Sequence, residues 1–79
     1  MIGDRYEYQI EEGKYSSFKI IAFTTDSIIV VKNKLYKTRK HKVMSIDKDE
    51  NYSNTGQTFS KKDINQMYHE KLIFGINRK

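Results

Sequence analysis

The chain has 79 residues, no cysteine and a formal net charge of +5 at pH 7, and 37% of its residues are hydrophobic. A chain of this length buries only one modest core, so residues 1–79 are predicted to form a single small domain. The absence of cysteine excludes a disulfide framework and a thiolate metal site, and the apolar and aromatic content argues against intrinsic disorder.

The first predicted element is a strand over residues 5–10. Tyr6, Tyr8 and Ile10 alternate there with polar residues, and alternation with a period of two is typical of a half-buried strand. Residues 11–14 are polar and predict a turn, in which Gly13 can adopt a positive φ.

A β-hairpin is predicted next, and it is the strongest structural signal of the chain. Its arms are residues 18–23 (FKIIAF) and 28–31 (IIVV), which are rich in β-branched and aromatic residues, and residues 24–27 (TTDS) favour a turn between them. Both faces of each arm are apolar. We therefore expect these strands to be covered on both faces or sharply curved, as in a small closed barrel.

The segment after the hairpin predicts one more strand and a loop. Residues 43–46 (VMSI) are predicted to form a strand, joined to the hairpin by a turn near residues 37–40. Residues 47–57 are polar and end near Gly56, so they are predicted to form a flexible loop.

Several signals in the residues that follow predict a helix and agree on where it starts. Ser60 as N-cap with Asp63 three residues later is a variant of the capping box, and Phe59 and Ile64 have the spacing of a hydrophobic staple. Apolar residues at helical spacing predict an amphipathic helix over about residues 61–71. Residues 72–76 (LIFGI) predict a closing strand, followed by a basic end at Arg78 and Lys79.

Together these elements predict a mainly β fold of five strands with one short helix before the last strand. The chain resembles small SH3-like barrels of the Tudor and KOW type, in which an opening Gly-Asp begins the first strand, as Gly3-Asp4 does here. The resemblance implies a five-stranded barrel that binds nucleic acid or peptides and carries no catalytic residues. The predicted helix is longer than the single turn usual in such barrels, so an α+β fold with an open sheet is the alternative.

The charge of the chain is concentrated in residues 32–42 (KNKLYKTRKHK), called here the basic tract. Six of its eleven residues are lysine or arginine and none is acidic, so the remainder of the chain holds nine basic and ten acidic residues. A local excess of charge of this kind is typical of a binding face. Lysine outnumbers arginine twelve to three in the chain. Because arginine is preferred for bidentate contacts with bases, this composition favours weak, sequence-independent contact.

The basic tract therefore predicts a surface that follows the phosphate backbone of DNA or RNA. If Ile29, Val31 and Leu35 face inward along one extended strand, the alternate residues project outward on one face. Tyr36 is the expected stacking group for an unpaired base, with His41 and Tyr52 as further candidates. The candidate nucleic-acid-binding residues are Lys32, Lys34, Tyr36, Lys37, Arg39, Lys40, His41 and Lys42.

Two other interpretations of the basic tract stay open. Lysines on an exposed strand also prevent aggregation between sheet edges, so the tract can be a solubilising edge without further function. It can also belong to a protein-interaction or accessory module that accepts an acidic protein or peptide at the sheet edge or between loops.

Other classes of function find no support in the sequence. Asp47, Asp49 and Asn51 have the spacing of a calcium loop, but Tyr52 and Thr58 stand where such a loop needs glycine and a bidentate carboxylate, so no metal is expected. No nucleophile with a base and no glycine-rich phosphate loop is recognisable, and neither an enzyme nor a cofactor is expected. The longest apolar runs are four residues, and we expect a cytoplasmic protein that is not integral to a membrane.

Overall fold

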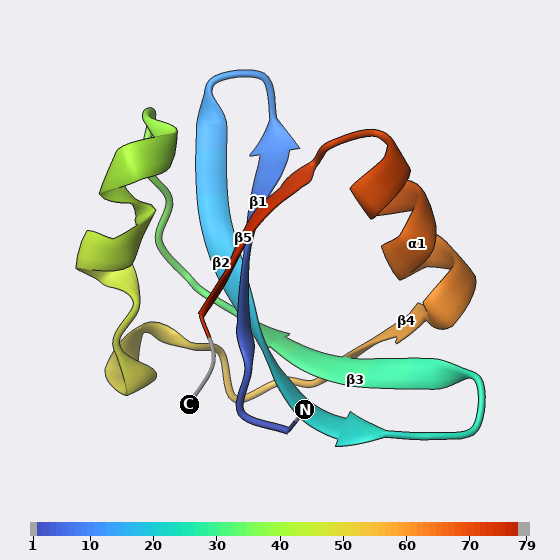
Figure 1. Ribbon diagram of the computed structural model, residues 1–79. Coiled ribbons are helices and arrows are strands. Elements are labelled where there is room, and N and C mark those ends of the chain that lie inside the picture. Colours follow the sequence, from blue (N-terminus) through green and yellow to red (C-terminus); the bar gives the residue numbers. More distant parts are fainter. Residues whose placement is uncertain (1, 78–79) are drawn as a thin grey trace.

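The computed structural model describes residues 2–77 and contains one five-stranded antiparallel sheet with helical segments on both sides (Figure 1). The expected basic end at Arg78 and Lys79 lies outside the described residues. None of the helices within residues 2–77 has the length and hydropathy of a transmembrane helix. In chain order the elements are β1 (Arg5–Glu11), β2 (Lys14–Phe23), β3 (Ser27–Lys32), the 3-10 helices η1 (Lys40–Ile46) and η2 (Asp49–Asn51), β4 (Gln57–Ser60), α1 (Lys61–His69) and β5 (Ile73–Asn77).

The sheet is open, with the strand order β4-β3-β2-β1-β5. The closed barrel expected from the sequence is therefore wrong, and the open sheet that stood as the alternative is correct. The helix α1 accounts for this result, because it lies between β4 and β5 in the chain and contacts both, so that the two edges do not meet (Figure 1). The mainly β class, the number of strands and the position of the helix before the last strand are confirmed.

The predicted hairpin and its neighbouring turn are confirmed. The strands β2 and β3 pair antiparallel, with Phe23 opposite Ile28 next to the turn. Gly13 has a φ of +79° in the turn between β1 and β2, as the sequence predicts. The strand β2 is longer than predicted, because its first residues pair with β1.

One face of the sheet packs against α1 and forms the main core. Tyr8, Phe18, Val30, Ile64 and Ile73 belong to its buried cluster. The capping box of α1 is confirmed: the Ser60 hydroxyl accepts a hydrogen bond from the Asp63 backbone N–H, and the Asp63 carboxylate accepts one from the Ser60 backbone N–H.

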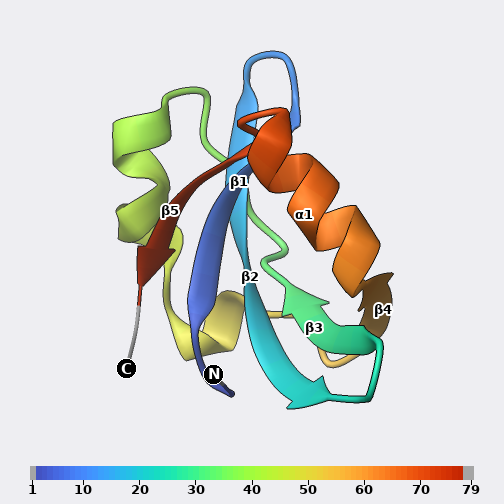
Figure 2. The same ribbon diagram turned by 45° about the vertical axis from the view of Figure 1, so that its right-hand side comes forward.

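Part of the opposite face of the sheet is covered by η1 and η2, which lie on the side away from α1 (Figures 1 and 2). The predicted strand over residues 43–46 is wrong, because these residues belong to η1. A 3-10 helix repeats every three residues, which places Lys40, Val43 and Ile46 on one side, and the last two are buried. The strand β2 is thus covered on both faces over part of its length, whereas Ile21 is 41% exposed, so the expected cover on both faces is confirmed only in part.

The predicted flexible loop over residues 47–57 is only partly correct. Its first half contains η2, and Tyr52 is 5% exposed and pairs with Asn33 in an isolated β-bridge. The fourth strand of the sheet is β4, a short edge strand with Phe59 as its one large apolar residue, which pairs with β3 through its backbone. Backbone pairing with little apolar content explains why the sequence pattern did not predict this strand.

Candidate nucleic-acid interface

The basic tract runs from the end of β3 along β2 to η1. Lys32 is the last residue of β3, and Lys40 is the first residue of η1. Between them, Lys37 forms an isolated bridge with Tyr15, in which the two residues exchange backbone hydrogen bonds of 2.7 and 2.8 Å. The condition of one extended strand from Ile29 to Leu35 is therefore not met, since regular pairing ends at Lys32.

Three hydrogen bonds fix the backbone of the tract between β3 and η1. The Ser16 hydroxyl donates to the Leu35 carbonyl at 2.5 Å, and the Leu35 N–H donates to the Asn33 side-chain oxygen at 2.9 Å. The Lys34 N–H donates to the Asn51 carbonyl at 2.8 Å. These bonds hold residues 33–37 against β2 and the η1–η2 segment, so the side chains of this part project from a fixed backbone.

Most charged groups of the tract are open to solvent and have no acidic partner. Within residues 2–77, all ion pairs are made by Arg5, Lys14 or Lys19, and no tract residue takes part in one. Lys32 and Lys37 are half-buried. The exposed members of the predicted site are Lys34, Tyr36, Arg39, Lys40, His41 and Lys42.

Two lysines of the tract lie over aromatic rings on opposite sides of the sheet. The Lys32 Nζ lies 5.3 Å from the ring centroid of Phe59, which packs against the core on the α1 side. The Lys40 Nζ lies 5.8 Å from the ring centroid of Tyr15 and 5.3 Å from that of Phe74, on the η1 side. Lys32 and Lys40 therefore lie on opposite sides of the sheet, and for these two cations the expectation of one shared face is wrong.

Tyr36 is the exposed aromatic residue of the tract, and 51% of its surface is accessible. The Lys14 Nζ lies 5.1 Å from its ring centroid and 2.8 Å from the Glu11 carboxylate. The hydrogen bond and the charge of Glu11 raise the pKa of Lys14. Tyr52, the other tyrosine predicted to stack, cannot do so because it is buried.

Tyr52 instead belongs to a buried polar network that the sequence did not predict. Its hydroxyl lies 2.8 Å from the Ser17 hydroxyl and donates to the Asp47 carboxylate at 2.7 Å. Burial is the main cause that raises the pKa of Tyr52, and the hydrogen bond to Asp47 adds to it. Asn33 donates to the Ile46 carbonyl at 2.7 Å, so the network ties the end of η1 to β2 and β3.

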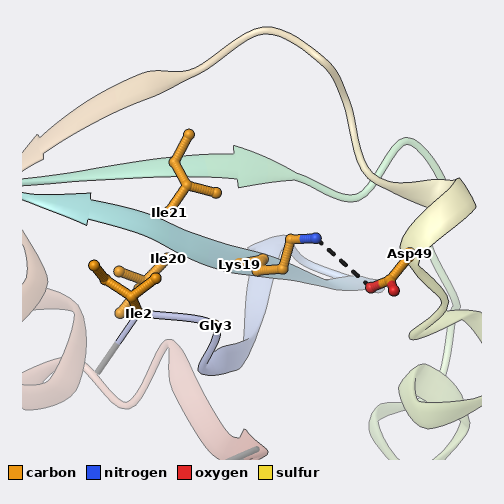
Figure 3. Close-up of a pocket in the computed structure, with 6 residues that line it drawn as sticks. All are labelled: Ile2, Gly3, Lys19, Ile20, Ile21 and Asp49. Atoms are coloured by element: carbon orange, nitrogen blue, oxygen red, sulfur yellow. Dashed lines mark ion pairs between the residues drawn. The ribbon is translucent and has the colours of Figure 1, made fainter.

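Arg5 is the charged centre of this network. Its Nη1 donates to the Asp47 carboxylate at 2.8 Å, its Nη2 pairs with Asp49, and its guanidinium carbon lies 5.4 Å from the ring centroid of Tyr52. The Lys19 Nζ approaches Asp49 to 3.6 Å (Figure 3). Two acidic residues that follow the tract, Asp47 and Asp49, are thus directed at Arg5 and Lys19 in the sheet. Asp47 and Asp49, which have the spacing of a calcium loop in the sequence, form ion pairs.

A surface hollow of about 310 Å³ lies beside the Lys19–Asp49 pair. Figure 3 shows the apolar side chains of Ile2, Ile20 and Ile21 around it, with Lys19 reaching away from them toward Asp49. Among the described residues, no member of the basic tract lines this hollow. The hollow is therefore separate from the candidate interface.

Comparison with protein-family models, with curated proteins and with solved structures finds no match for this chain. The function of the candidate interface is therefore inferred from the geometry and charge of the chain itself.

Proposed function

We propose that the protein is a non-enzymatic binding module that holds a nucleic-acid backbone weakly, without regard to sequence, through the basic tract. One observation carries this proposal. Asp47 and Asp49, which follow the tract, pair with Arg5 and Lys19, whereas the cations of the tract have no acidic partner within residues 2–77. Phosphates would supply the missing negative charge, and the release of their counterions would drive binding.

The side chains suited to this contact are those without another structural role. Lys34, Arg39 and Lys42 are exposed, whereas Lys32 and Lys40 also lie over aromatic rings. Lysines bind phosphates as point charges and carry little information about base identity. With a single arginine in the tract, binding without sequence preference fits the chemistry better than readout of base edges.

The fold gives further support to a binding role. Five antiparallel strands with the helix between β4 and β5, and Gly3-Asp4 before β1, support a likeness to SH3-like small barrels in an open form. This likeness implies a platform for nucleic acid or peptides. We place this function in the cytoplasm, because a chain without cysteine needs no oxidising compartment.

A second candidate function is protein interaction, and the open sheet is the observation that favours it. The strands β4 and β5 are edges, each with one side that pairs with no other strand of residues 2–77. Such an edge can accept a strand from a partner by backbone hydrogen bonds. An acidic peptide that binds the tract is a variant of this candidate. Protein capture that survives loss of nucleic-acid binding would favour this second function.

The proposal is tested by fluorescence anisotropy of short labelled DNA and RNA strands over a range of salt concentrations. Binding at low ionic strength is expected, with a logarithmic salt slope of about −2 to −4 if three to six phosphates of a single strand are neutralised. DNA and RNA of different sequence are expected to bind alike. An affinity that is undetectable at low ionic strength would refute the proposal.

A further inference from the structure

We infer that the strand bound by the basic tract is unpaired, and that one of its bases stacks on Tyr36. This inference rests on the proposed function and narrows it from nucleic acid in general to single strands. It is carried by the way in which the structure holds the Tyr36 ring.

The backbone on both sides of Tyr36 is tied to β2. The Leu35 carbonyl accepts a hydrogen bond from the Ser16 hydroxyl at 2.5 Å, and Lys37 exchanges two backbone hydrogen bonds with Tyr15. An exposed aromatic side chain on a fixed backbone loses little further freedom when it binds a ligand. Tyr36 is thus pre-organised, whereas an aromatic residue on a free loop would not be.

A second contact supports the ring itself. The Lys14 Nζ lies 5.1 Å from the ring centroid of Tyr36, and the Glu11 carboxylate holds Lys14 at 2.8 Å. This cation–π contact restrains the ring against β2 and leaves 51% of the residue exposed to solvent. A planar group of a ligand can therefore cover the exposed part of the ring.

The charges beside Tyr36 fit a strand whose bases are free. Lys34 and Lys37 lie on either side of it in the sequence, and Arg39 follows. Proteins that bind single strands combine such cations with aromatic rings, because each base offers an apolar face to stack on. A duplex stacks its bases internally, so it can offer phosphates to the tract but no base face to Tyr36.

An anionic lipid surface is the competing occupant of this site. Leu35 and Met44 are exposed in and beside the tract, and a bilayer interface would bury such side chains while its headgroups met the cations. Because Tyr36 is 51% exposed and its ring already accepts a cation–π contact from Lys14, the site suits a planar base, which stacks on an aromatic face, better than a flexible acyl chain. Vesicles that contain phosphatidylserine therefore form one arm of the test.

The test compares ligands with equal backbone charge but different bases. Anisotropy is measured with an oligothymidylate, an abasic strand of the same length and a duplex, for the unchanged protein and for the substitutions Tyr36→Ala and Tyr36→Phe. The control is Tyr68→Ala on α1, which changes another tyrosine that is 40% exposed. Far-UV circular dichroism verifies that each variant is folded.

We expect Tyr36→Ala to weaken oligothymidylate binding at least about 5-fold, since this loss of affinity corresponds to the weakest stacking of one base on an aromatic ring. Tyr36→Phe and Tyr68→Ala should keep the affinity, and the abasic strand should bind all variants alike. Equal loss on the abasic strand and on oligothymidylate overturns the stacking inference but leaves the backbone contact standing. Tighter binding of the duplex or of the vesicles also overturns it. If no polyanion binds, the proposed function itself is wrong.

Discussion

Replacing Asp47 by alanine is expected to destabilise the domain strongly, because the charge of Arg5 stays buried without its main partner. The side chains of Arg5 and Asp47 are 8% and 11% exposed. Asp47 accepts hydrogen bonds from the Arg5 Nη1 at 2.8 Å, from the Tyr52 hydroxyl at 2.7 Å and from Asn77 at 3.2 Å. One substitution therefore removes the acceptor of three donors.

The expected loss of stability depends on the partners that Arg5 keeps after the substitution. Loss of one partner of a buried ion pair costs about 3–5 kcal/mol. Arg5 retains Asp49 and the backbone carbonyl of residue 47 at 3.3 Å, although its Nε already lacks a hydrogen-bond partner among the described residues. We therefore expect the lower end of the range, a loss of about 3 kcal/mol in the free energy of unfolding.

Urea unfolding followed by far-UV circular dichroism measures this loss. With a slope of about 1 kcal/mol/M for a small domain, the unfolding midpoint should fall by roughly 3 M. The control is Glu12→Ala, which removes an exposed carboxylate in the turn after β1 and should change stability by less than about 0.5 kcal/mol. A loss below about 1 kcal/mol for Asp47→Ala would refute the role given to the network.

Two further predictions concern tyrosine ionisation and the cap of α1. Burial raises the pKa of Tyr8 and of Tyr52, so these side chains lose their protons at a lower pH in the unfolded chain than in the folded one. Their contribution to the free energy of unfolding should be fully present below about pH 10 and should fall as the pH rises above it. Urea midpoints measured across this range test the prediction, and Tyr52→Phe should flatten the fall; an unchanged slope would contradict it. Ser60→Ala should cost about 1 kcal/mol by removal of the N-cap acceptor of α1, measured by thermal unfolding, with Ser45→Ala on the surface of η1 as the comparison. Equal losses for the two serine variants would show that the cap adds nothing.

The parts of the fold that the sequence predicted correctly carry strong local signals. The hairpin arms are dense in β-branched residues, and Ser60 and Asp63 mark the start of α1 by their spacing alone. The prediction for residues 43–46 failed because a short apolar run has no clear period. Val43 and Ile46 suit a 3-10 helix as well as a strand, and their burial under the second face of the sheet decided between the two.

The candidate site was predicted in composition but not in shape. The charge of the basic tract and the exposure of Tyr36 could be expected from the sequence. The buried network could not, because Arg5 and Asp47 are 42 residues apart and no local pattern links them. Tyr52 was assigned to a flexible loop for the same reason: its partners Ser17 and Asn33 belong to distant parts of the chain.

In the proposed function, the position of the charge in the basic tract produces binding, and not the total charge of the chain. Two variants with equal net charge test it, since each replacement of a basic residue by glutamate changes the charge by two units and three take the chain from +5 to −1. Lys40 is left unchanged because it packs over Tyr15 and Phe74. The tract variant combines Lys34→Glu, Arg39→Glu and Lys42→Glu, and the control variant combines Lys48→Glu, Lys62→Glu and Lys71→Glu, all at exposed positions.

The decisive measurement is the affinity of these two variants for a labelled oligothymidylate at one low salt concentration. We expect the tract variant to lose at least about tenfold in affinity relative to the control variant. Equal affinities of the two variants would contradict it, because the binding would then depend on the net charge of the whole chain.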